Sequence, residues 1–228
     1  KLHPDGLSLA HRMECLRTLK RIGFQTGCGF MVGSPGQTPE CLAKDMAFIR
    51  ELNPQMVGIG PFIPQHDTPF RDERAGAFEE TLWLLGLIRL MLPRVLLPAT
   101  TALGTIHPKG RELGMLAGAN VVMPNLSPLG VRKKYLLYDN KICTGDEAAE
   151  SLNSLKESMK AIGYEVAVGR GDNKLAKEKG RESSGIPDSK ERKIICIIHH
   201  QTKQGSLSAM KKSWKPWPMQ RLTKITKS

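Results

Sequence analysis

Two stretches of the chain end an apolar run in glycine, which suits a site where the main chain meets a ligand. Residues 29–36 read G-F-M-V-G-S-P-G, and residues 56–64 read M-V-G-I-G-P-F-I-P. Glycine has no Cβ, so the backbone can approach a ligand closely at these positions. We therefore expect consecutive βα units to place both strand ends around a single ligand.

The turn at residues 33–36 has two interpretations. It can cradle a phosphate, but no Lys-Ser or Lys-Thr follows it, which argues against a nucleotide P-loop. Taken alone, it is better explained as a structural turn. Its pairing with Gly58 and Gly60 favours a ligand shelf.

Hydroxyl groups follow a third predicted strand. Thr100 and Thr101 lie at its C-terminal end, where barrel enzymes place their chemistry and where hydroxyls and amides suit an anion. The pair fits a helix cap equally well. Tyr135 and Tyr138 are spaced so that both can face one side of a turn, and core packing is the alternative for them.

The cysteines and histidines form no recognisable metal motif. The five cysteines show no paired framework, which is typical of reduced cytosolic thiols. A C-x7-C-x2-C cluster motif beginning at Cys143 would need cysteines where the chain has Ser151 and Ser154, and serine is a poor iron–sulfur ligand. Cys196 has two histidines nearby but lacks a second pair at zinc spacing.

The basic charge is concentrated at the C-terminal end. The net charge is +12, but residues 175–228 hold 13 Lys and Arg against 4 Asp and Glu, which leaves +3 for the rest. The longest apolar stretch is interrupted by charged residues and proline, and no secretory signal opens the chain. These features predict a cytoplasmic protein without a membrane span. Because Lys1 stands where an initiator methionine is usual, we expect a fragment.

Hydrophobic periodicity predicts alternating helices and strands up to residue 173. The helices are predicted at residues 8–22, 38–52, 77–92, 108–117 and 147–162, and the strands at residues 25–32, 55–60, 94–99, 120–123 and 164–168. Without hairpin signals, this order predicts a parallel sheet with helices outside it. Half of a barrel and a small doubly wound sheet both remain open.

The chain is predicted to have two regions, a partial barrel at residues 1–173 and a basic tail at residues 174–228. The tail lacks sustained periodicity apart from a short apolar run at residues 194–198. We expect it to be disordered, or to be a translation across a frameshift or gene junction.

Several stretches of the first region resemble the radical-SAM maturases of FeFe-hydrogenase, the HydE family. They are MVGSPGQT, QMVGIGPFIPQHDTPF, LLPATTALGT, GANVVMPN and KKYLLYDNKICTGDEAA. The resemblance implies the C-terminal half of a radical-SAM (β/α)8 TIM barrel with a biotin/thiamin-synthesis-associated C-terminal region. Biotin synthase and methylornithine synthase share this architecture and are the alternatives.

The resemblance also implies a reaction and its cofactors. The family holds a 4Fe–4S cluster and cleaves S-adenosylmethionine reductively to a 5′-deoxyadenosyl radical, during assembly of the hydrogenase active-site subcluster. Its C-x3-C-x2-C cluster motif is absent from this chain, so we expect the cluster ligands in the missing N-terminal half and no turnover from the chain alone. An iron–cysteine complex is the implied substrate, and other hydrogenase maturases are the implied partners.

On the cofactor side, the resemblance assigns roles to five residues. Arg12 is expected to pair with the methionyl carboxylate, with a solvated helix face as the alternative. Met31 and the strand Val57, Gly58 and Ile59 are expected to line the adenosyl pocket, with the backbone satisfying adenine edges. None of these residues is expected to be catalytic or to bind a metal.

On the substrate side, the resemblance assigns five more. Thr100 and Thr101 are expected to form an anion site, and Met123, Tyr135 and Tyr138 are expected to form the cavity wall. Because of the two serines noted above, we expect the accessory cluster of some relatives to be missing.

Two other classes of function remain. In the first, the basic tail binds nucleic acid, which the low charge of the first region does not favour. In the second, residues 1–173 are a complete small α/β binding protein that melts cooperatively. We expect instead an unstable half-barrel, because missing strands leave two open sheet edges.

Overall fold

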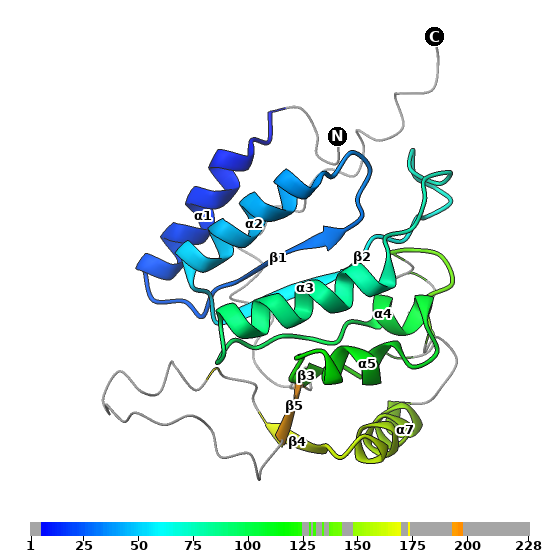
Figure 1. Cartoon of the computed structure of the whole chain (residues 1–228). Helices are drawn as coiled ribbons and strands as arrows, with labels where there is room; N and C mark the ends of the chain where they lie inside the picture. Colours follow the sequence, from blue (N-terminus) through cyan, green and yellow to red (C-terminus); the bar gives the residue numbers. More distant parts are fainter. Residues whose placement is uncertain are drawn as a thin grey trace, which may run out of the picture. The chain divides into compact units, whose positions relative to one another are not determined.

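The computed structural model describes residues 6–124, 128, 130, 134, 137–142, 148–169, 173 and 193–197, the last of these as backbone alone. All of them belong to one compact unit, residues 1–198. Helices and strands alternate in the N-terminal part of this unit, and a run of three helices follows (Figure 1). In chain order they are α1 (Leu9–Arg21), β1 (Gly27–Val32), α2 (Pro39–Leu52), β2 (Met56–Pro61), α3 (Phe78–Met91), α4 (Thr101–Ile106), α5 (Gly110–Leu116), β3 (Val121–Val122), α7 (Ala148–Ala161), β4 (Glu165–Gly169) and β5 (Lys193–Ile197).

Local signals set the boundaries of the first two helices. The Ser8 hydroxyl accepts a hydrogen bond from the His11 N–H (3.2 Å), and the Thr38 hydroxyl accepts one from the Cys41 N–H (3.4 Å). Asn53 ends α2 in the left-handed conformation, at φ 45°, which asparagine adopts more readily than most residues. Both predicted helices are thereby confirmed.

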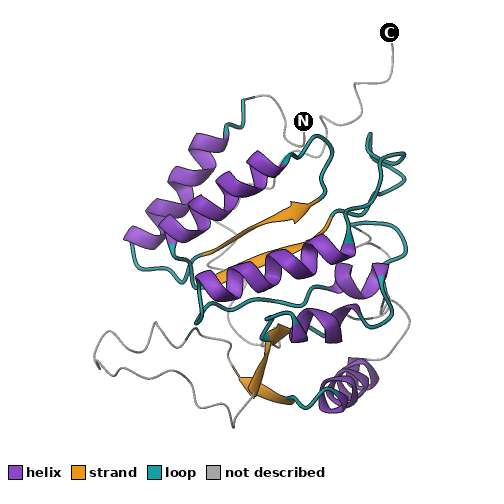
Figure 2. Ribbon diagram, in the orientation of Figure 1, coloured by secondary structure: helices purple, strands orange, loops and turns teal. Residues whose placement is uncertain are grey.

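β1 and β2 form a parallel pair (Figure 2). Their register places Gly29 opposite Gly58 and Met31 opposite Gly60. A helix joins them, as the connection between parallel neighbours requires. The prediction of a parallel sheet is therefore confirmed at its first two strands.

The predicted strand at residues 94–99 is wrong as a regular strand. The segment joins the sheet only through isolated parallel bridges, from Leu96 to β2 and from Pro98 to β3. Pro98 has no N–H to give to a ladder, and the Leu97 N–H donates to the Asn120 side chain instead (2.8 Å). Two successive residues therefore contribute no ladder N–H, and the backbone ladder is interrupted there.

A second parallel group follows in the order β3, β5, β4. The bridge at Pro98 connects it to the first pair, so parallel segments run from β1 to β4. β4 confirms the strand predicted at residues 164–168. β5 lies in the predicted tail, at the short apolar run noted in the sequence.

The later helices match the predictions except at one place. α3, α5 and α7 confirm the helices predicted at residues 77–92, 108–117 and 147–162. The six-residue α4 was not predicted. No helix in the described part of the chain combines the length and apolarity that a bilayer span requires.

Helices cover one face of β1 and β2. Val32, Val57 and Ile59 point to that face and pack against Ile49 of α2 and Leu85 of α3. The alternate residues of both strands are exposed or partly exposed. An open parallel sheet is normally covered on both faces, whereas the strands of a barrel have helices on one face only. This pattern favours the partial barrel over the doubly wound sheet.

Asn173 fastens the N-terminal edge of the sheet. The residue is 0% exposed. Its side-chain amide donates to the carbonyls of Gln55 (2.7 Å) and Arg94 (3.2 Å), and its N–H donates to Gln25 Oε1 (3.0 Å). These three partners immediately precede or begin three adjacent parallel segments, so one residue, through its side chain and its backbone N–H, cross-links the starts of all three.

Candidate functional site

We call the face of β1 and β2 opposite the helices the inner face. Four of its six residues are glycines, so main chain forms most of its surface. Met31 adds a large side chain that is 47% exposed. The six residues are Gly27, Gly29, Met31, Met56, Gly58 and Gly60.

The inner-face glycines are surrounded differently. A Cβ on Gly29 would lie 2.7 Å from the carbonyl carbon of Gly58, so the closeness of the two strands excludes a side chain there. A Cβ on Gly60 would lie 2.7 Å from the Thr100 hydroxyl oxygen. A Cβ on Gly58 would have no neighbour within 4 Å. Gly58 therefore borders open space that a ligand can fill.

Val57 and Ile59 flank Gly58 but turn their side chains away from the inner face. Both are buried in the core against α2 and α3, so only their main chain can face a ligand. The Val57 N–H donates to the Leu96 carbonyl (2.9 Å). The next ladder bond would come from residue 98, but Pro98 has no N–H to return to the Val57 carbonyl. The hydrogen-bonding capacity that the main chain of β2 does not use within the sheet therefore lies beside Pro98.

Thr100 has an unused hydroxyl at the C-terminal edge of the sheet. It occupies the N-cap position of α4 without making a side-chain cap bond. Its Oγ1 is buried and has no hydrogen-bond partner within the described part of the chain. Thr101 begins α4, and its carbonyl accepts a bond from the Thr105 hydroxyl (3.1 Å). Of the two threonines, Thr100 is the one whose hydroxyl oxygen is buried without a partner in the described part of the chain.

The structure places Met31, Gly58 and Gly60 on the inner face and Thr100 beside Gly60. Arg12 is exposed on α1. Met123 follows β3 and is 41% exposed. Tyr138 is partly buried, with the Lys141 ammonium 6.0 Å from its ring centroid. Tyr135 lies outside the described residues.

The turn at residues 33–36 is satisfied internally. The Gly33 N–H donates to the Gln37 side-chain oxygen (2.7 Å), and the Gln37 side-chain nitrogen donates to the Met31 carbonyl (3.0 Å). Ser34 also directs its hydroxyl to the Met31 carbonyl (3.3 Å). These bonds support the structural interpretation of the turn over the phosphate cradle.

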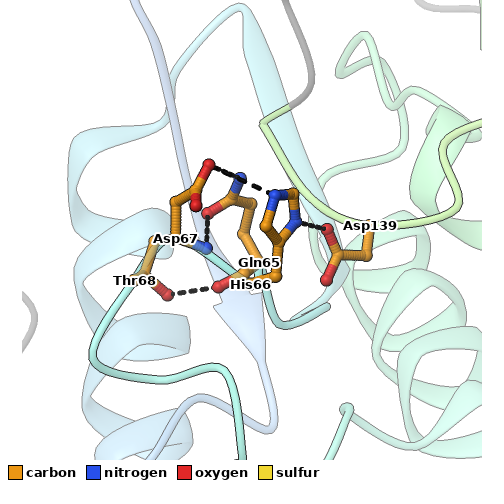
Figure 3. Close-up of polar contacts among 5 residues, drawn as sticks. All are labelled: Gln65, His66, Asp67, Thr68 and Asp139. Carbon is orange, nitrogen blue, oxygen red and sulfur yellow. Dashed lines mark hydrogen bonds and ion pairs between the residues drawn. The ribbon is translucent and has the colours of Figure 1, made fainter.

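A polar cluster in the loop after β2 was missed from the sequence (Figure 3). His66 Nδ1 lies 2.6 Å from Asp139 Oδ1, and His66 Nε2 lies 3.2 Å from Asp67 Oδ2. The hydrogen bond with Asp139 and the nearby carboxylate charges raise the pKa of His66. Searching for paired histidines could not find this cluster, because its partner is an aspartate 73 residues away.

The two serines that occupy the cysteine positions of the cluster motif line a small pocket. Ser151 and Ser154 of α7 meet Arg111 of α5 there, around a volume of about 130 Å³. Ser158 continues the same face of α7. The pocket lies among α4, α5 and α7, away from the inner face.

The described residues do not fit a 4Fe–4S cluster. No group of three His, Cys, Asp or Glu side chains in the described part is arranged to hold a metal ion. Cys15, Cys28 and Cys41 lie on three different elements, α1, β1 and α2. The inner face does fit an organic ligand, because Gly58 borders open space.

Comparison with known proteins gives a consistent result. No family model matches the chain. The chain is 46% identical over 163 residues to the FeFe-hydrogenase maturase subunit HydE of Thermotoga maritima, covering 72% of this chain and 47% of that protein. It is 27% identical to 3-methylornithine synthase of Methanosarcina barkeri, covering 71% and 45% of the two proteins. It is 33% identical to biotin synthase of Corynebacterium jeikeium, covering 49% and 31%.

The fold agrees with these relatives. The solved structure of methylornithine synthase (PylB) matches with a TM-score of 0.55 at 24% identity, over 70% of this chain and 45% of that one. The parallel segments, the helices on one face and these matches define a radical-SAM TIM-barrel protein of the biotin synthase-like group. Within that group the chain belongs to the HydE family, and it spans about half the length of the HydE protein that it matches.

Proposed function

We propose that the chain is the C-terminal half of a HydE-type radical-SAM enzyme and that its inner face binds S-adenosylmethionine. One observation carries the proposal: two adjacent parallel strands bury their apolar side chains against helices and present glycine to the other side. Such a wall accepts a flat nucleoside because no side chain stands in its way. When bound and reduced, S-adenosylmethionine supplies a 5′-deoxyadenosyl radical, and the cysteines for the reducing cluster are not in this chain.

In this proposal the adenosyl group lies against Gly58 and beside Met31. The open space at Gly58 gives room for the base, and the exposed Met31 side chain covers one side of it. Val57 and Ile59 contribute main-chain groups beside Pro98, where the ladder is interrupted. A purine edge can pair with such groups.

The charged ends of the ligands are assigned to two threonines and an arginine. Arg12 lies in the first half of α1, and an α-helix that precedes a parallel strand starts near the C-terminal edge of the sheet. It would pair there with the methionyl carboxylate. Thr100 would donate its unused hydroxyl to an anionic substrate group, and Thr101 would add its main chain. The cavity wall would comprise Met123, Tyr135 and Tyr138.

A second half of the barrel is needed to close the site. β1 lies at one end of the strand order. α1, next to it, has no buried residue. Leu9, Ile22 and Phe24 are all more than 60% exposed in this region. Because relatives are about twice as long as the match, we propose that their other half packs against this surface. The same proposal includes a cytoplasmic location, an iron–cysteine complex as the substrate and other hydrogenase maturases as partners.

The proposal is tested by completing the barrel. The chain is co-expressed with the N-terminal half of the Thermotoga maritima HydE, reconstituted anaerobically with iron and sulfide, and assayed for 5′-deoxyadenosine and methionine. We expect both products. Their absence from a folded, cluster-containing complex would overturn the enzymatic proposal.

A matched pair of variants tests the inner face. Gly58→Val fills the open space and is expected to weaken S-adenosylmethionine binding at least about tenfold, since mismatched pocket volume costs that much or more. Gly27→Val makes the same change at the opposite end of the inner face and should leave affinity unchanged. Equal affinities in the two variants would show that the ligand does not lie against Gly58.

A further inference from the structure

Two segments far apart in the chain meet at His66. Its Nδ1 faces Asp139 at 2.6 Å and its Nε2 faces Asp67 at 3.2 Å (Figure 3). Asp67 belongs to the same loop after β2, whereas Asp139 belongs to the segment at residues 137–142. The imidazole ring is therefore held between two carboxylates from different parts of the fold.

Hydrogen bonds fix the loop and dock the distant segment onto it. The Thr68 hydroxyl donates to the Gln65 carbonyl (2.8 Å), and Gln65 Oε1 accepts from the Asp67 N–H (2.7 Å). The Asp139 N–H donates to the Pro64 carbonyl (3.1 Å). The loop is thus a closed turn that offers both a carbonyl and a charged ring to Asp139.

The docked segment carries Tyr138, directly before Asp139. At its other end, the Ile142 N–H donates to the Thr105 hydroxyl of α4 (3.4 Å). The loop after β2 and α4 both follow C-terminal ends of parallel segments, which is the edge where barrel sites lie. The two anchors therefore hold Tyr138 at that edge.

We infer that doubly protonated His66 is a positioning residue that latches residues 137–142 onto the loop after β2, and that the latch weakens when the ring loses a proton. A neutral imidazole has one N–H, so it can donate to one carboxylate only and turns a lone pair toward the other. The imidazolium donates to both Asp67 and Asp139. The role of Tyr138 toward substrate rests on the proposed function, whereas the latch itself does not.

The electrostatic surroundings set the direction of the pH effect. The hydrogen bond with Asp139, and then the charges of Asp67 and Asp139, raise the pKa of His66 above its ordinary 6.5, with desolvation acting the other way. A group whose pKa is raised by folding stabilises its contact at low pH and loses it as the pH rises through the raised value. Lys141 is a further charged group near Tyr138, with its ammonium 6.0 Å from the ring centroid. The latch is thus strongest in mildly acidic solution and weaker in alkaline solution.

NMR of the uniformly isotope-labelled 228-residue chain, in complex with the half that completes the barrel, tests the latch directly. We expect His66 to titrate above an ordinary histidine and the Asp139 N–H to shift with the same midpoint. Asp139→Asn should lower the His66 midpoint by more than Asp67→Asn does, because Asp139 makes the shorter contact. A His66 midpoint unchanged by Asp139→Asn overturns the inference.

Kinetics of the same complex test the positioning role. His66→Gln cannot carry the charge and is expected to raise KM for the substrate about two- to fivefold at pH 6, as the loss of exposed ion pairs allows. It should leave kcat and the KM at pH 9 nearly unchanged. His11→Gln, on α1, is the matched control and should behave as wild type. An unchanged KM at pH 6 overturns the role of His66, whereas a wild-type complex that makes no 5′-deoxyadenosine overturns the proposed function and leaves the NMR result to decide the latch.

Discussion

Room for a side chain differs between two glycines that face each other across β1 and β2. At Gly29, an added methyl would meet the backbone of Gly58, which cannot move without breaking the strand pair. At Gly58, the same methyl would enter open space. Two chemically identical substitutions therefore probe strand packing in one case and the ligand space in the other.

We expect Gly29→Ala to lower the free energy of unfolding of the completed barrel by about 1–3 kcal/mol, the usual cost of overpacking. Gly58→Ala should change it by less than about 0.5 kcal/mol. Urea unfolding followed by circular dichroism measures both. Equal losses in the two variants would show that the strands are spaced differently from this structure.

The cysteines offer a second test at the same scale. Burial, and then the charge of Asp45, raise the pKa of Cys28 to about 11. Hydrogen bonds from Thr38 lower the pKa of Cys41, which is exposed. At pH 8 only about one Cys28 thiol in a thousand is then the reactive thiolate.

Iodoacetamide at pH 8 should therefore label Cys41 well before Cys28, as read by mass spectrometry of peptides over time. In guanidinium chloride, which removes both environments, the two rates should converge. Faster labelling of Cys28 in the folded complex would contradict its placement against the core.

Among the larger elements, Asn173 joins the starts of three parallel segments, two of them through its side chain. Replacing it with alanine leaves the carbonyls of Gln55 and Arg94 without that donor at a buried position. A buried group left unsatisfied costs about 1–3 kcal/mol each. The loss is expected at the N-terminal edge, far from the inner-face ligand space.

Asn173→Ala is thus expected to destabilise the completed barrel by about 2 kcal/mol or more while leaving affinity for S-adenosylmethionine unchanged. Asn153→Ala, at an exposed position of α7, is the matched control and should have little effect. Thermal melts and equilibrium binding read the two quantities. A loss of affinity without a loss of stability would place Asn173 in the site instead.

Hydrophobic periodicity predicted the helices and strands that have one buried face. It was wrong at the segment where a side chain takes the place of a backbone partner in the sheet ladder. α2, α3 and the first two strands follow from apolar spacing and glycine stops. The segment at residues 94–99 has the right composition, but Pro98 and the Asn120 side chain interrupt its ladder. α4 was missed because six residues carry less than two full turns of pattern.

The candidate site was predictable only where local sequence decides it. The strand-end glycines could be found because glycine itself marks close approach. The gathering of Gly60 with Thr100 depends on the register of segments that follow each other in the sheet. The contact of His66 with Asp139 depends on tertiary docking, which no local window contains. Site residues were therefore predictable where one stretch of sequence contains them all, and not predictable where two distant segments each contribute one.

At the scale of the whole molecule, the described part has an open sheet edge and an uncovered inner face. β1 ends the strand order, α1 buries nothing, and the inner face is exposed. Parallel edges of this kind invite pairing with another chain. The chain spans about half the length of the HydE protein that it matches.

Residues 1–173 alone should therefore melt broadly and bind a hydrophobic dye, whereas the complex with the completing half should melt in one sharp transition. Differential scanning calorimetry distinguishes the two, because a two-state melt gives equal calorimetric and van't Hoff enthalpies. A sharp transition of residues 1–173 alone would support the alternative of a complete small domain.

The alternation along β1 and β2 also has a consequence for how such proteins diverge. Positions that pack against the helices and positions on the inner face, where we propose that the ligand binds, occupy opposite sides of the same strands. Substitutions of helix-facing side chains can therefore accumulate without changing the inner face. Laboratory evolution of new substrate preferences would have to start from the loops and threonines at the C-terminal edge of the sheet, because the inner face consists mostly of glycine main chain and offers few side chains to change.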